Sequence, residues 1–258
     1  MRRLNKIESM PTEIFFRRGR LSQHAPHTFC LWLLASFCLT AQAQDIFSAL
    51  SPGQALPKDF RVVTYPNIKP NQFSLVIDEG KTVLKIDANN SAGSVAVPVA
   101  LLGGQRSNTL EWRWKVDRTL DRADMDEKIA DDQSARLFVF FDVPLESLPF
   151  ADRTKIKLAR SVSGTDVPTA ALCYVWDNKH RVGYTAWSPY TQRLRKVVLQ
   201  SGPEAIGQWR LESRDVAADF KKAFGFDAPA VTGIAMGNDT DNTDDRVTTW
   251  FGAVSFKK

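Results

Sequence analysis

The chain has 258 residues, with 34 basic and 29 acidic side chains and a formal net charge of +5. Residues 1–43 hold six of the basic and two of the acidic side chains, so the remainder is close to neutral. This balance gives no support to nucleic acid or an anionic membrane surface as a partner. The length that remains after residue 43 suits one domain with a full hydrophobic core.

Residues 1–43 have the pattern of a secretory signal peptide. A basic stretch precedes the apolar run from Phe29 to Leu39, and Ala41-Gln42-Ala43 is a small-residue cleavage signal. The apolar run is too short for a stable membrane span. We therefore expect cleavage near Ala43 and a periplasmic or secreted protein, with an uncleaved anchor as the alternative. The natural start is either Met1 or Met10.

Beyond this leader the chain keeps one cysteine, Cys173, and one histidine, His180. A disulfide within the exported chain is thereby excluded, and a zinc site built from histidine and cysteine is not expected, because such sites need several of these ligands. Cys173 lies in an apolar run, so we expect a buried thiol. His180 lies in a turn beside Asp177, and without a Gly-x-Ser-x-Gly motif a Ser-His-Asp triad is not expected.

Residues 44–58 contain prolines and a glycine and are predicted to be a lead-in outside the core of a single domain, 59–258. Twelve runs bounded by turn signals predict strands. They are 60–65, 73–78, 82–88, 94–102, 110–117, 135–141, 170–176, 182–187, 194–200, 209–214, 231–237 and 246–256. Residues 144–164 are hard to assign, and 155–158 is either a strand or a helical turn.

One short helix is predicted near 215–224. Asp215 is placed to cap its start, and Gly225 is placed to end it. Many short strands and one helix predict an all-β fold, an antiparallel β-sandwich of jelly-roll type.

Two tryptophan-containing strands alternate between apolar and polar residues. In 110–117 the apolar residues share one face, while Glu111 and Arg113 lie on the other. In 209–214, Arg210 and Glu212 share the polar face. If both polar faces line one cleft, Glu111 and Glu212 are candidate catalytic carboxylates. The alternative is that both are exposed residues paired with Arg113 and Arg210.

The loop 238–245 holds four carboxylates and two amides. Oxygen ligands at this density suit a hard cation such as calcium, with Asp239 and Asp241 as ligands and Asp131 and Asp132 as weaker candidates. The glycine and distal glutamate of a helix-loop-helix calcium motif are missing. The competing interpretation is that Asp and Asn side chains cap the turns of this loop.

Trp187 and Tyr190 lie in a polar stretch, which makes them better candidates for stacking on sugar rings than the tryptophans on apolar strand faces. Core packing is the alternative for both.

Several phrases, in this order and spacing, resemble a bacterial family known as domain of unknown function 3047. They are 110–114, 131–132 with 135–136, 172–176, 212–216 leading to Phe220 and 224–225, and 239–243. The resemblance spans roughly 60–256. It implies an exported β-sandwich protein, and it assigns no activity and no catalytic residue.

Three functional hypotheses follow. The favoured one is a non-catalytic module that binds a glycan or envelope polysaccharide, with ligand-binding candidates Arg113, Arg136, Trp187, Tyr190 and Arg210. This assignment of ligand class rests on analogy between folds. The second is a polysaccharide hydrolase or lyase that uses carboxylates and arginines on a concave sheet face. The third is a structural envelope protein.

Overall fold

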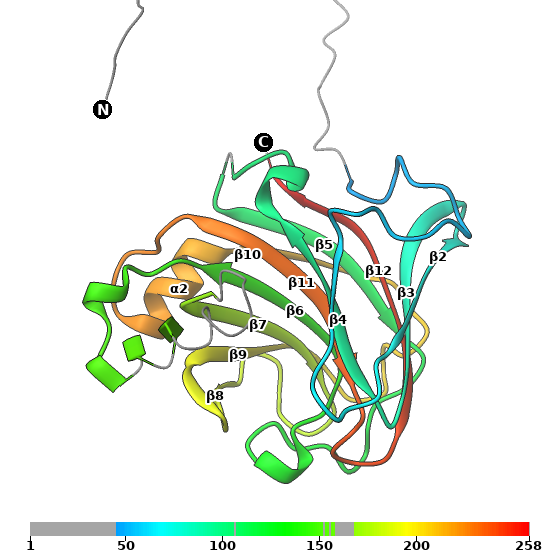
Figure 1. Cartoon of the computed structure of the whole chain (residues 1–258). Coiled ribbons are helices and arrows are strands. Elements are labelled where there is room, and N and C mark those ends of the chain that lie inside the picture. Colours follow the sequence, from blue (N-terminus) through cyan, green and yellow to red (C-terminus); the bar gives the residue numbers. More distant parts are fainter. Residues whose placement is uncertain (1–44, 106, 152, 155, 158–167, 258) are drawn as a thin grey trace, which may run out of the picture. The chain divides into compact units, whose positions relative to one another are not determined.

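The computed structural model describes residues 45–105, 107–151, 153–154, 156–157 and 168–257. The predicted signal peptide therefore lies outside the described residues, as do Lys155 and Leu158 of the region that was hard to assign. In the described residues, twelve strands form two sheets (Figure 1). The predicted all-β sandwich is confirmed.

The larger sheet has seven strands. Their order across the sheet is β1 (Arg61–Val63), β4 (Ala92–Pro98), β11 (Val231–Asp239), β6 (Gln133–Phe141), β7 (Ala170–Asp177), β9 (Thr191–Ser201) and β8 (Thr185–Ser188). Neighbouring strands are antiparallel except for β7 and β9, which are parallel. This pair departs from the prediction of a wholly antiparallel sandwich, and it arises because β8 returns along the outer edge of β9.

The smaller sheet has five antiparallel strands. Their order is β10 (Arg210–Asp215), β5 (Thr109–Val116), β12 (Arg246–Phe256), β3 (Lys81–Asn89) and β2 (Gln72–Asp78). Short 3₁₀ turns occur at η1 (Val99–Leu102), η2 (Lys128–Ala130) and η3 (Leu145–Ser147).

Helix α2 spans Val216–Phe224, as predicted. The Asp215 carboxylate accepts hydrogen bonds from the backbone N–H groups of Ala217 and Ala218, which satisfies two donors of the first turn. Gly225 ends the helix in the left-handed conformation, with φ of 84°. Residues 150–151, 153–154 and 156–157 are also helical. No helix in the described part of the chain is long and apolar enough to cross a bilayer.

The core between the sheets is rich in aromatic side chains. Trp112 and Trp114 point inward from β5, as the alternation predicted, and both are fully buried. The ring of Trp112 lies 5.6 Å from that of Trp114 and 5.2 Å from that of Tyr174, while Trp114 lies 5.9 Å from Trp176. These rings join the two sheets, because Tyr174 and Trp176 belong to β7.

The segment before β1 contributes to this core, which corrects the prediction that it lies outside. Phe47 is fully buried, and its ring meets that of Phe60 edge to face at 6.2 Å. Ile46, Leu50 and Leu56 of the same segment also pack against the core. The segment is short and interrupted by prolines and polar residues, so its sequence pattern did not distinguish it from a surface lead-in.

The outer face of the seven-stranded sheet has two halves. In the covered half, Met125 lies over Cys173, Val175 and Val198, which form a second, smaller apolar cluster on β7 and β9. The predicted buried thiol of Cys173 is confirmed, and burial raises its pKa to about 12. In the open half, outward side chains of β1, β4, β11 and β6 line a groove.

Candidate functional site

The groove of the open half has a volume of about 630 Å³. Phe138 and Phe140 of β6 line its floor. Their rings are nearly parallel, with an interplanar angle of 14° and a distance of 6.1 Å between the ring centroids. Both are only partly buried, although β6 has a neighbour on each side. Charged and hydroxyl side chains also line the groove, namely Asp59, Arg61, Tyr65 and Asp142.

Small residues keep the groove open next to these rings. Strand register places Ala235 beside Phe138 and Gly233 beside Phe140, with Ala96 beside Ala235 on the next strand. A Cβ atom at Gly233 would lie 2.7 Å from the carbonyl oxygen of Val97. A larger residue at this position would therefore displace the backbone of β4.

A charged cluster borders the groove where β6 begins. Arg136, a predicted ligand-binding residue, forms an ion pair with Asp239, and its guanidinium lies 5.6 Å from the ring centroid of Phe138. In the covered half, the fully buried Lys196 forms an ion pair with Asp131 and donates to the carbonyl oxygen of Met125 at 3.1 Å. Burial lowers the pKa of Lys196. This pair fixes the loop that carries Met125 onto β9.

The structure brings three predicted metal ligands together. Carboxylate oxygens of Asp132, Asp239 and Asp241 lie within 4.8 Å of one another, and burial followed by the charge of Asp132 raises the pKa of Asp241. Asp131 pairs with Lys196 instead. Calcium binding here stays a prediction.

Hydrogen bonds in this loop favour the turn-capping alternative. One oxygen of Asp132 accepts from the backbone N–H of Asn242 at 3.2 Å, and the other accepts from the N–H and hydroxyl of Thr243 at 2.7 Å. Asp239 accepts from the backbone N–H of Gln133 at 3.0 Å, beside its ion pair with Arg136. Asp132 and Asp239 are thus already compensated by protein donors.

Glu111 and Glu212 do not share a cleft, which corrects the hypothesis that pairs them. Register places Glu212 opposite Trp112 and Ser213 opposite Glu111, so the two carboxylates lie on opposite faces of the sheet. Glu212 points inward and accepts from the indole N–H of Trp114 at 3.1 Å and the amide of Gln200 at 2.7 Å. Burial raises its pKa.

Strand β10 therefore faces the opposite way from the predicted orientation, and Leu211 points outward with 74% of its surface exposed. The buried indole of Trp114 requires an acceptor, and Glu212 on the edge strand supplies it. Glu111 faces outward, accepting from Ser213 at 3.2 Å and pairing with Lys257 at 3.3 Å.

The remaining arginine candidates lie away from the groove. Arg113 lies on the outer face of the five-stranded sheet, with its guanidinium 4.1 Å from the ring centroid of Trp209 and 3.2 Å from Glu79. Arg210 is an exposed residue of the edge strand β10, in register with Trp114. These residues therefore do not form one binding surface with Arg136.

Trp187 and Tyr190 do not form a joint platform. The ring of Trp187 packs edge to face against Phe224 of α2 at 5.4 Å and under Arg195 at 4.8 Å. Tyr190 is 56% exposed and donates its hydroxyl to the carbonyl oxygen of Lys128 at 3.0 Å. The ammonium of Lys128 lies over the Tyr190 ring, 5.0 Å from its centroid, so the exposed ring already has a cationic partner.

The fold and site define a two-sheet β-sandwich with an aromatic-floored groove on the outer face of its larger sheet. The chain belongs to the family described as protein of unknown function (DUF3047), whose model matches residues 58–255. No curated protein matches the chain.

The solved structures that match the chain include glycoside hydrolases. The xyloglucanase domain of NopAA from Sinorhizobium fredii, in complex with cellobiose, has 8% identity and a TM-score of 0.39, with 79% of this chain and 100% of that chain covered. A structure from a comparison of family 12 glycoside hydrolases has 11% identity and a TM-score of 0.39, covering 82% and 99%. Endoglucanase 3 of Trichoderma harzianum, from family GH12, has 8% identity and a TM-score of 0.34, covering 78% and 100%.

Proposed function

We propose that the protein binds a glycan or envelope polysaccharide, without cleaving it, in the groove of the open half. The observation that carries this proposal is the pair of nearly parallel, partly exposed rings of Phe138 and Phe140 on a central strand. Aromatic faces present apolar surface to the apolar faces of sugar rings. The charged groups that line the same groove supply hydrogen-bond partners for hydroxyl groups.

The proposed location is the periplasm or the cell exterior, where such polymers occur. It depends on cleavage of the leader near Ala43. Cell fractionation with N-terminal sequencing tests it, and protein found only in the cytoplasmic fraction with residues 1–43 retained would contradict it.

Polysaccharide cleavage is less well supported. The carboxylate pair that the sequence offered for it, Glu111 and Glu212, lies on opposite faces of one sheet. A hydrolase needs two carboxyl groups that flank the scissile bond. A purely structural role is the third alternative, and a single screen separates all three.

The screen measures retention on a broad polysaccharide panel and the chain length of each polymer afterwards. Retention without shortening supports the proposal. Shortening of a polymer supports the hydrolase or lyase hypothesis. Neither retention nor shortening on any polymer of the panel supports the structural role.

The variants Phe138→Ala and Phe140→Ala test whether the polysaccharide is retained through the groove. Each is expected to weaken binding by about 2- to 10-fold, because an aromatic contact contributes about 0.5–1.5 kcal/mol. The matched control is Phe150→Ala, which removes the same side chain from a position that is 77% exposed and does not line the groove. Equal losses in all three variants would contradict the assignment.

A further inference from the structure

The imidazole of His180 is held in one orientation by a buried carboxylate. Its Nδ1 lies 2.9 Å from an oxygen of Asp177, which also accepts the backbone N–H groups of Lys179 and His180 at 3.1 and 2.6 Å. The side chain of Asp177 is 1% exposed. Because an ionised carboxylate only accepts hydrogen bonds, Nδ1 carries the proton and Nε2 is left to face the other way.

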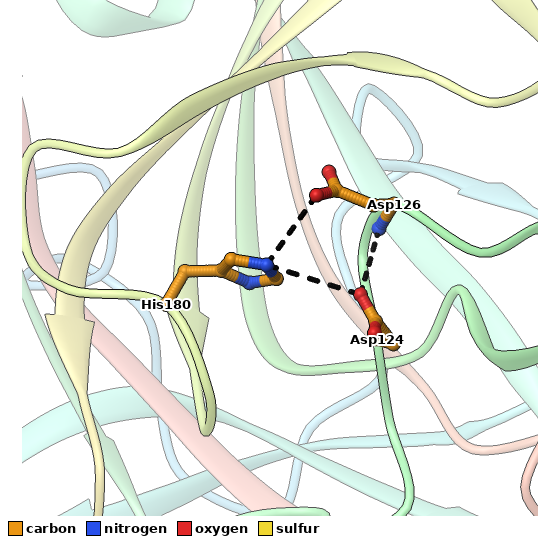
Figure 2. A group of neighbouring side chains, drawn as sticks. All are labelled: Asp124, Asp126 and His180. Carbon is orange, nitrogen blue, oxygen red and sulfur yellow. Dashed lines mark hydrogen bonds and ion pairs between the residues drawn. The ribbon is translucent and has the colours of Figure 1, made fainter.

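Nε2 faces two further carboxylates, as Figure 2 shows. It lies 3.4 Å from an oxygen of Asp126 and 3.9 Å from an oxygen of Asp124, both in the segment that links β5 to β6. The ring of Tyr184 stacks on the imidazole at 4.4 Å, and its hydroxyl donates to Asp126 at 2.6 Å. The imidazole is thus fixed from its face as well as from its Nδ1 side.

This arrangement favours a positive species at its centre, although the Asp124 oxygen that faces Nε2 also accepts the backbone N–H of Asp126 at 3.1 Å and the Asp126 oxygen accepts the Tyr184 hydroxyl. A lone pair on Nε2 and two carboxylate oxygens repel one another unless a proton or a metal ion lies between them. The exposed Lys179 pairs with the other oxygen of Asp124, so it compensates one carboxylate from the side.

The spacing matches the ligands of a small divalent ion. Metal–ligand bonds of about 2.0–2.2 Å in a tetrahedral site place neighbouring ligand atoms about 3.3–3.6 Å apart. The nitrogen and the Asp126 oxygen already have this separation, and the Asp124 oxygen lies a few tenths of an ångström beyond it. The ligand atoms of the three residues all lie within 4.8 Å of one another.

We propose that Asp124, Asp126 and His180 bind a divalent transition-metal ion of the zinc type, with Asp177 as the positioning residue for the imidazole. A nitrogen ligand favours such an ion over calcium or magnesium, which take oxygen ligands. A carboxylate behind a ligating histidine is the usual second partner in metal sites. Three protein ligands leave a coordination position for water.

The aspartates belong to the segment that carries Met125, and the histidine follows β7. The ion therefore fastens the cover of the covered half to the sheet. This role is independent of glycan binding, because the site does not line the groove.

Isothermal titration calorimetry with ZnCl₂ on the chelator-treated, tag-free chain tests the proposal. The leader contains His24, His27, Cys30 and Cys38, which could also bind zinc, so all four are replaced by alanine in every version. We expect one zinc per chain, loss of binding in His180→Ala and Asp126→Asn, and binding about 10- to 100-fold weaker in Asp177→Asn. A tenfold excess of calcium is expected to leave the zinc isotherm unchanged.

Asp241→Asn is the matched control, because it removes one carboxylate from the other acidic cluster. Zinc binding that is absent, that survives in both ligand variants, or that is lost in Asp241→Asn would overturn the proposal. The His180 imidazole NMR signals provide a second readout in the unmutated site, and they are expected to shift on zinc addition. Asp126 is partly exposed, so its variant decides the question if His180→Ala fails to fold.

Discussion

The two halves of the seven-stranded sheet have similar strands, but the outer face of one half is buried and that of the other is accessible. Cys173 and Phe138 are register neighbours on β7 and β6. Cys173 is fully buried beneath Met125, whereas Phe138 packs against the edge of the same cluster and stays partly exposed in the groove. The difference comes from a loop that crosses one half and is anchored there by the ion pair of Lys196 with Asp131. The extent of the groove is therefore defined by where the covering loop stops.

The largest expected effect comes from releasing the cover. Lys196→Ala leaves Asp131 buried without its cation, so we expect a loss of about 3–5 kcal/mol in the free energy of unfolding. Urea unfolding measures it. The control is Lys85→Ala, whose pair with Asp87 at 2.8 Å is partly exposed and is expected to contribute less than about 1 kcal/mol. Equal losses would show that Lys196 does not anchor the loop.

Truncating one side chain in each half compares the halves directly. Met125→Ala removes a fully buried side chain and is expected to cost about 2–5 kcal/mol. Phe138→Ala removes a ring that already contacts solvent, so about 1 kcal/mol is expected. Thermal or urea unfolding gives both values, and a Phe138 loss as large as that of Met125 would mean that the open half is packed.

Glu212→Gln tests whether function is confined to the groove, because Glu212 points into the core from the other sheet. Burial raises the pKa of Glu212 above 4.5, so the folded chain holds this proton more tightly than the unfolded chain. The resulting stability is present below pH 4.5 and is lost as the pH rises through the folded-state pKa.

Glutamine keeps the hydrogen bonds without the charge. We therefore expect a gain in stability of less than about 1 kcal/mol at pH 7, after allowance for solvent screening, and none at pH 4. Polysaccharide retention should not change. Glu111→Gln, on the outward face, is the control for unfolding at the two pH values. Abolished polysaccharide cleavage in Glu212→Gln would instead revive the enzyme hypothesis.

The smallest effect is expected from calcium at the 238–245 loop. Protein donors already compensate Asp132 and Asp239, so the melting temperature of the chelator-treated, zinc-free chain should be equal with and without added calcium. An ion that binds only the folded chain raises the melting temperature. A rise that is lost in Asp241→Asn would establish the calcium site.

The alternation of polar and apolar residues predicted β5 correctly and β10 incorrectly. Four large apolar residues share one face of β5, and their combined burial leaves only one orientation. In β10 the only apolar residue is Leu211, and a hydrogen bond from Trp114 to Glu212 outweighs its burial. Such a contact joins residues 98 positions apart, so no local pattern contains it.

The groove and the histidine cluster were missed for different reasons. Residues 135–141 are apolar on both faces, which predicted burial on both, and only the course of another loop decides that Phe138 stays accessible. His180 has Asp177 nearby in sequence, so the sequence alone indicates that neighbour. Asp124 and Asp126 lie more than 50 residues away and join it only through the covering loop.

The seven-stranded sheet ends on very short strands, with three residues in β1 and four in β8. A long, flat edge strand would offer a row of unpaired backbone groups to another chain. Here few such groups are available at either end, while the long strands β11, β6, β7 and β9 are enclosed between neighbours. The sheet can therefore present an apolar groove on its face and still resist growing sideways into aggregates.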